Sequence, residues 1–120
     1  MSRKRDYLLD MLDYTQKITD FTHEGRAAFF ADEKTQLAVI RAYEVIGEIA
    51  KRLPDLLLEQ QPQVAWKKDK GFRDFLAHNY EAVILQIVWG AVEELPELRA
   101  AVEKLLMTAE VNEADEDVEE

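Results

Sequence analysis

Residues 39–54 read VIRAYEVIGEIAKRLP and carry the clearest fold signal in the chain. Apolar side chains recur here every three or four residues, which places them on one face of an α-helix. Those positions are Val39, Ile40, Tyr43, Ile46, Gly47, Ile49, Ala50 and Leu53. Proline lacks a backbone N–H and restricts the residue before it, so Pro54 predicts a helix end near Leu53. Asp32 is the expected N-cap of this helix.

The same helical period continues on both sides of this stretch. An earlier helix is predicted from about Tyr7 to Phe21, with fraying over 22–25 and a short connection over 26–31. Residues 55–63 are less regular and predict a loop or one helical turn. Three more helices are expected. The first starts within residues 64–66 and ends within 78–81, and the second runs from about Val83 to Leu95. The third is a short helix over 97–107, with Pro96 suited to its first turn. The sequence therefore predicts an all-α fold, an antiparallel up-and-down four-helix bundle with a short fifth helix.

Composition narrows the class of protein further. The chain has 120 residues, no cysteine, four glycines and three prolines. The lack of cysteine excludes a disulfide scaffold, a thiolate metal site and a cysteine nucleophile. No apolar run reaches the roughly 18 residues of a membrane span. We expect one soluble domain in the cytoplasm, with no contact to a membrane.

Charge is distributed unevenly along the chain. Seven acids and no base lie between Glu110 and Glu120, and removing them from the net charge of −10 leaves −3 for the rest. Such an acidic run predicts a disordered tail over 109–120, after a helical domain over 1–108. The predicted helix after Val83 is apolar over more than one stripe. Either a dimer contact or a central, buried position would explain that equally well.

Several kinds of site lack the residues they need. The chain has two histidines, His23 and His78, and no metal-binding HExxH spacing. Glu44 and Glu48 share a helix face, but no Glu-x-x-His pair accompanies them. There is no glycine-rich phosphate loop, and Ser2 is the single serine. We therefore expect no metal, no cofactor and no serine nucleophile.

The residues that can carry chemistry are concentrated in residues 67–80, KKDKGFRDFLAHNY. The guanidinium of Arg73 can bind two phosphate oxygens, and His78 can take up or release a proton near neutral pH. Together they suffice for metal-free cleavage of RNA, which carries its own 2′-hydroxyl nucleophile. Lys67, Lys68 and Lys70 would then contact RNA phosphates. On composition alone, a surface arginine and an ordinary histidine explain this stretch as well.

The order Arg73-x-x-x-x-His78-x-Tyr80, with Asp74 after the arginine, resembles the motif of the HEPN superfamily, and the extra tyrosine resembles its HepT-like branch. Trp66 before the motif and the run Tyr43 to Glu48 agree with it. The likeness covers about residues 7–106. Ala65 stands where many relatives have proline, and the acidic tail lies outside the family pattern.

The resemblance implies a homodimeric, metal-independent endoribonuclease, the toxin partner of a minimal nucleotidyltransferase antitoxin. It implies that Arg73 and His78 are catalytic, that Asp74 supports the site and that Tyr80 receives AMP from the antitoxin. An adenylylated Tyr80 would block RNA by charge and volume. Glu48 is either a surface charge or a residue that supports the motif.

Helix geometry limits how Arg73 and His78 could act on the same phosphate. At about 100° per residue, His78 lies about 140° around a straight helix from Arg73. The helix must therefore break near His78, or two subunits must complete the pair, and we favour the second arrangement. The alternative function is a non-catalytic helical module that binds a nucleotide or docks a nucleotidyltransferase. His23 is expected at the surface, and Trp66 and Trp89 in the core or an interface.

Overall fold

A computed structural model describes residues 3–66 and 82–119, with side chains for 3–66 and 84–108. Within these ranges every regular element is a helix, which confirms the predicted all-α fold. The helices are α1 (Arg3–Phe21), α2 (Arg26–Ala31), α3 (Glu33–Arg52), α4 (Asp55–Leu58), α6 (Ala82–Glu93) and α7 (Leu95–Glu119). The molecule is elongated, 50 × 27 × 23 Å along its principal axes. None of the described helices has the length and apolarity to cross a membrane.

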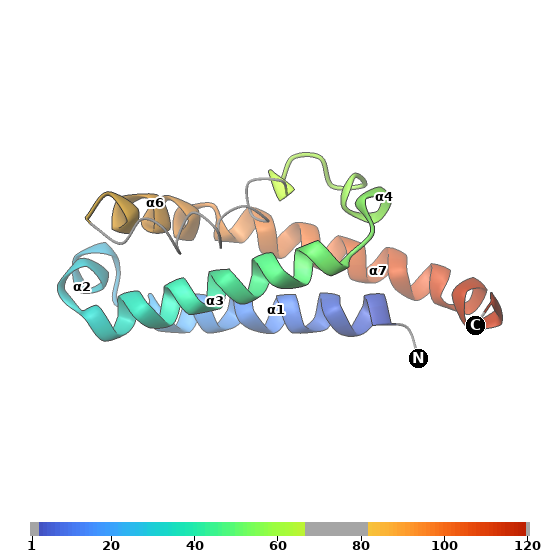
Figure 1. Cartoon of the computed structure of the whole chain (residues 1–120), viewed down its shortest axis with the longest axis horizontal. Coiled ribbons are helices and arrows are strands. Elements are labelled where there is room, and N and C mark those ends of the chain that lie inside the picture. Colours follow the sequence, from blue (N-terminus) through green and yellow to red (C-terminus); the bar gives the residue numbers. More distant parts are fainter. Residues whose placement is uncertain (1–2, 67–81, 120) are drawn as a thin grey trace.

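The long helices lie side by side along the long axis of the molecule (Figure 1). α1 packs against α3, which runs back in the opposite direction, and against α7. α6 precedes α7 along the same direction and contacts α3. The reversal of direction from α1 to α3 agrees with the predicted up-and-down order. The helix predicted from 64–66 to 78–81 lies outside the described residues beyond Trp66.

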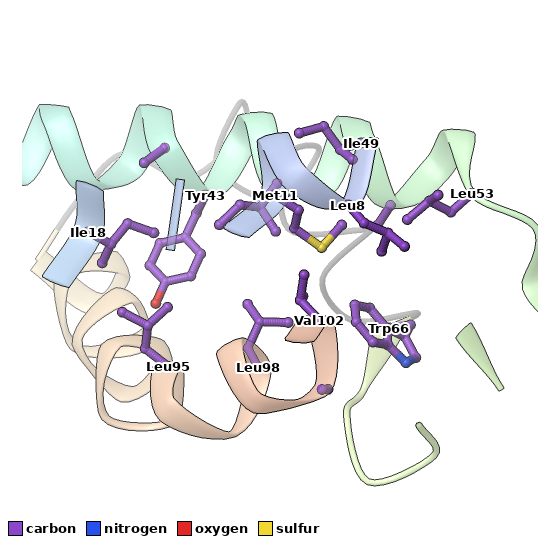
Figure 2. Packing of buried hydrophobic residues seen from close by; sticks show 14 of the residues in the cluster. Leu8, Met11, Ile18, Tyr43, Ile49, Leu53, Trp66, Leu95, Leu98 and Val102 are labelled. Carbon is purple, nitrogen blue, oxygen red and sulfur yellow. The ribbon is translucent and has the colours of Figure 1, made fainter. Parts of the chain in front are cut away.

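One apolar core fills the space between α1, α3 and α7 (Figure 2). The spacing of three or four residues puts one stripe of each helix inside. The labelled core residues are Leu8, Met11, Ile18, Tyr43, Ile49, Leu53, Trp66, Leu95, Leu98 and Val102. Thr15 is the one polar residue among the buried side chains described, and its hydroxyl donates to the Leu12 carbonyl at 2.6 Å. The buried hydroxyl is thereby satisfied.

The local signals that bound α3 are confirmed. The Asp32 carboxylate accepts from the backbone N–H of Lys34 at 3.3 Å and from the Thr35 hydroxyl at 2.6 Å. Leu53 is the C-cap and is followed by Pro54, as the sequence predicts. α4 is the single helical turn that residues 55–63 allowed.

The connection over 26–31 is helical, which the sequence analysis did not predict. α2 buries the Phe29 ring, which is 1% exposed, against the core. The Gln36 amide of α3 donates to the carbonyls of Phe29 at 3.0 Å and Phe30 at 3.2 Å. These bonds satisfy carbonyls that a helix C-terminus otherwise leaves without partners. α2 therefore depends on a residue outside the segment itself.

The last helix is longer than predicted. The expected fifth helix ends near Met107, but the backbone of α7 is helical from Leu95 to Glu119, with Pro96 in its first turn. No glycine or proline follows Pro96 to end the helix, and glutamate and alanine are good helix formers. The helical backbone thus continues where the composition predicts a disordered tail. The domain boundary between residues 108 and 109 stays a prediction.

Candidate active site

The predicted catalytic and RNA-contacting residues all fall in one segment that lies outside the described residues. They are Lys67, Lys68, Lys70, Arg73, Asp74, His78 and Tyr80. Their roles and their mutual geometry therefore stay predictions. The structure does describe the residues that flank this segment, the position of Glu48, and the surface between α3 and α6.

Trp66 fixes the chain immediately before the motif segment. Its indole is 8% exposed and lies in the core near Leu8 and Leu53 (Figure 2). The indole N–H donates to the Gln61 carbonyl at 3.0 Å, so its one polar group is satisfied. Trp66 is thus a core residue, one of the two positions predicted for it. Its packing and hydrogen bond hold the backbone at the residue that precedes the motif segment.

α6 fixes the chain immediately after the segment. It begins at Ala82, two residues after Tyr80, and buries Ile84 (3% exposed) and Val88 (0% exposed). Trp89 packs on the core from the same helix, with its ring centroid 5.4 Å from that of Phe29. Trp89 is thus half-buried against the core, in keeping with the prediction that it lies in the core or an interface. Both ends of the motif segment are therefore held by one apolar core.

A cavity of about 470 Å³ opens between α3, α6 and the turn before Trp66. Its apolar wall includes Tyr43, Val64 and Ile87, and the side toward α7 carries the carboxylates of Glu94 and Glu97. No lysine or arginine of the described residues lines it. The charged groups among the described lining residues are therefore these two carboxylates. Sequence reasoning missed it because its walls come from distant parts of the chain.

Glu48 lies on α3 between Gly47 and Ile49, both of which are buried, and its own side chain is half-buried. One turn earlier, the Glu44 carboxylate lies 3.5 Å from the Arg41 guanidinium and pairs with it at the surface. Glu48 thus sits at the edge of the core-facing stripe rather than in open solvent. Its predicted role in supporting the motif stays a prediction.

Shifted pKa values among the described residues belong to local helix contacts. The Thr35 hydroxyl hydrogen bond lowers the pKa of Asp32, and the hydrogen bond to Asp13, at 2.8 Å, raises the pKa of Lys17. Both groups are exposed helix residues. His23 is exposed in the turn after α1, with Nδ1 2.8 Å from the Asp20 carbonyl oxygen, which confirms its predicted surface position. Each of these contacts lies within a single helix or at its end.

Comparison with known proteins decides the family. The model of the family described as "Ribonuclease HepT-like" matches residues 11–105. The chain belongs to the HepT-like ribonuclease family. The match begins within α1, ends in α7, and includes the whole motif segment.

Named relatives agree with this family. "Probable ribonuclease HepT" of Thermococcus cleftensis is 39% identical over 103 residues, which cover 84% of this chain and 94% of the relative. Two proteins of Methanocaldococcus jannaschii that carry RNase names are 43% identical over 89 residues and 36% identical over 112 residues. The first alignment covers 73% of this chain and 74% of the relative, and the second covers 89% and 93%. No solved structure matches the chain. Membership in a HepT-like family supports ribonuclease activity at the level of the family.

Proposed function

We propose that this HepT-like chain is a metal-independent endoribonuclease that acts as the toxin of a two-gene toxin–antitoxin system in the cytoplasm. The observation that carries the proposal is that the family match spans the segment with Arg73, His78 and Tyr80. Relatives that cover most of this chain carry ribonuclease names. Arginine and histidine in that order supply the two groups that RNA cleavage needs without a metal.

The proposed reaction uses the 2′-hydroxyl of RNA as the nucleophile. His78 serves one of the two proton transfers, either as the base that takes the 2′-hydroxyl proton or as the acid that protonates the leaving 5′-oxygen, and solvent water serves the other. The 2′-oxygen bonds to phosphorus as the bond from phosphorus to the 5′-oxygen breaks. This gives a 2′,3′-cyclic phosphate and a 5′-hydroxyl. Arg73 stabilises the negative charge that builds up on the phosphate oxygens, and Asp74 and Glu48 hold the site. Lys67, Lys68 and Lys70 contact neighbouring phosphates.

The proposed control point is Tyr80. Transfer of AMP from ATP to its phenol oxygen, by a partner nucleotidyltransferase, forms a phosphodiester on the tyrosine and releases pyrophosphate. Two residues from His78, the attached group would add negative charge and bulk where RNA must bind. Incubating the chain with that partner and ATP should add one or more AMP masses to the chain and none to a Tyr80→Phe variant.

The proposed active form is a homodimer whose motifs meet at the subunit interface. The structure supports it through α6, whose side chains are apolar on nearly every face. Ile87 is 39% exposed and Ala91, one turn later on the same flank, is half-buried, so this flank of α6 has apolar surface left to cover. Leu85, on the opposite flank, is half-buried as well. An Ile87→Glu variant should lower the mass in light scattering from that of a dimer to that of a monomer. If the Ile87→Glu variant keeps the mass of a dimer, the interface does not include Ile87.

The activity test uses purified chain, total RNA and excess EDTA. Wild type should cleave the RNA, and Arg73→Ala and His78→Ala should leave it intact while keeping the wild-type Tm and helical circular dichroism. His23→Ala is the matched control, because His23 is the second histidine of the chain and lies exposed in the turn after α1. A folded His78→Ala protein that cleaves as fast as wild type would overturn the assignment. Folded wild type that binds its nucleotidyltransferase but leaves RNA intact would favour the docking module instead.

A further inference from the structure

Trp66 is the last described residue before the motif segment, residues 67–80. Its ring is 8% exposed and lies in the core near Leu8 of α1 and Leu53 at the end of α3 (Figure 2). The backbone has helical geometry at Trp66 itself. The motif segment therefore continues from a side chain that the core already holds.

The turn before Trp66 is closed by hydrogen bonds that converge on Gln61. The Gln61 carbonyl accepts from the backbone N–H of Val64 at 3.3 Å and from the indole N–H of Trp66 at 3.0 Å. The Gln61 side chain accepts from the amide of Gln63 at 2.8 Å. The backbone N–H of Gln61 donates to the carbonyl of Leu58, a buried residue, at 3.0 Å. The turn is thus tied to the core at both of its ends.

The indole hydrogen bond fixes the orientation of the Trp66 ring as well as its depth in the core. A purely apolar ring is held by packing alone, whereas an indole also has one N–H that needs an acceptor when the ring is buried. Turning the ring away from the Gln61 carbonyl would leave that donor unsatisfied, which costs free energy. Packing and hydrogen bonding together therefore select one orientation of the side chain.

Helix geometry relates this orientation to the two predicted catalytic residues. The sequence predicts a helix that starts within residues 64–66 and ends within 78–81. Arg73 comes seven residues after Trp66, so the two side chains leave such a helix within about 20° of each other. His78 comes twelve residues after Trp66 and leaves the helix about 120° away. A rotation of the helix at Trp66 would turn both side chains.

We propose that Trp66 is a positioning residue of the ribonuclease site. Its buried ring and its bond to Gln61 fix the start and the rotation of the motif segment, and thereby the directions of Arg73 and His78. The inference rests on the proposed function, because it assigns Trp66 a part in that reaction. A displacement of about 1 Å at the reacting groups can cost about 100-fold in rate, so losing this anchor should slow cleavage in a protein that remains folded.

The kinetic test compares the two tryptophans of the chain. Trp66→Phe keeps an aromatic ring in the core but removes the indole N–H that bonds to Gln61. Trp89→Phe is the matched control, because Trp89 also packs on the core and lies beside Phe29 of α2. RNA cleavage is measured in EDTA at a temperature below the Tm of each protein. Trp66→Phe should lower kcat at least about tenfold and change KM less than about threefold, while Trp89→Phe changes kcat less than about twofold.

Two results would overturn the proposal. One is a loss of kcat in Trp66→Phe that is no larger than in Trp89→Phe. The other is a change in KM without a change in kcat, which would assign Trp66 to RNA binding. Wild type that leaves RNA intact would contradict the proposed function instead, and the exchange measurement below then tests the anchor by itself.

A tryptophan analogue serves if Trp66→Phe does not fold. In a Trp89→Phe background, the tryptophan at position 66 is replaced during expression by 3-benzothienylalanine, which keeps the shape of the ring and has sulfur in place of the N–H. Compared with the same background carrying ordinary tryptophan, kcat should fall at least about threefold, because one hydrogen bond is lost. An unchanged kcat would contradict the positioning role of that bond.

Hydrogen exchange tests the anchor without any RNA. In Trp66→Phe, backbone amides of residues 67–73 should exchange at least about tenfold faster than in wild type, while those of α3 keep their rates. Trp89→Phe should leave exchange over residues 67–73 unchanged. Equal exchange over these residues in Trp66→Phe and wild type would show that Trp66 does not hold the motif segment.

Discussion

Two glycines of the chain should respond in opposite ways to the same substitution. A Cβ atom added at Gly25 or at Gly90 would meet no atom within 4 Å, so neither alanine creates a clash with a neighbouring side chain. The difference lies in the backbone. Gly25 has φ 95° and ψ −176°, a conformation that is essentially restricted to glycine. Gly90 lies inside α6, where alanine is the better helix former.

The magnitudes follow from these two conformations. Gly25→Ala should destabilise the fold by about 1–3 kcal/mol, the usual cost of a strained backbone position. Gly90→Ala should stabilise it by about 0.5–1 kcal/mol, since alanine loses less backbone freedom in a helix. At about 4 °C per kcal/mol for a domain of this size, the two variants should differ in Tm by about 6–16 °C.

The assay is thermal unfolding by circular dichroism at one fixed protein concentration, because oligomerisation makes Tm depend on concentration. Equal Tm values for the two variants would refute the backbone argument for Gly25. A destabilising Gly90→Ala would show that another surface, such as a second copy of the chain, approaches α6 more closely at this point than the described residues do.

Further predictions concern the helix cap and the core. Asp32→Asn keeps the capping oxygen but cannot titrate. Because the folded-state pKa of Asp32 is lowered below its ordinary 3.8, wild type should be more stable than the variant above pH 3.8 and should lose that advantage as the pH falls through the folded-state pKa. Measuring the unfolding midpoint of both proteins across this acid range tests the prediction. A pH-independent difference between them would contradict the assigned contact. Leu105→Ala should cost about 2–5 kcal/mol in denaturant unfolding, because the side chain is fully buried between α7 and α1. Met107→Ala, two residues on and 68% exposed, should change stability by less than about 0.5 kcal/mol, and equal costs for the two would show that the packing of α7 is wrong.

Much of the fold follows from local signals in the sequence. The spacing of Leu8, Met11 and Ile18 predicts the buried stripe of α1, and Asp32 and Pro54 bound α3 where the structure bounds it. These signals act within one or two helical turns. A single sequence displays them directly, which is why the predicted helices agree with α1, α3, α4 and α6.

The features that the sequence did not predict depend on contacts between different elements. α2 is completed by the side chain of Gln36 in the next helix, which the spacing within either helix does not display. The helical backbone of α7 past Met107 is not predicted, because the composition of the acidic run indicates a disordered tail, although no glycine or proline follows Pro96 to end the helix. The cavity joins Tyr43, Val64 and Ile87, which lie far apart in the chain. Motif recognition supplied the candidate catalytic residues, whereas their arrangement in the proposed homodimer would depend on contacts between subunits, which one sequence does not display.

Complementation between two inactive variants tests the proposed catalytic site most directly. Arg73→Ala and His78→Ala subunits are coexpressed with different tags, the mixed dimer is purified through both tags, and RNA cleavage is measured in EDTA. If two subunits jointly supply the guanidinium and the imidazole, each mixed dimer regains one intact site and about half of the wild-type rate, while each variant alone stays inactive. A mixed dimer as inactive as its parents would contradict a site shared between subunits.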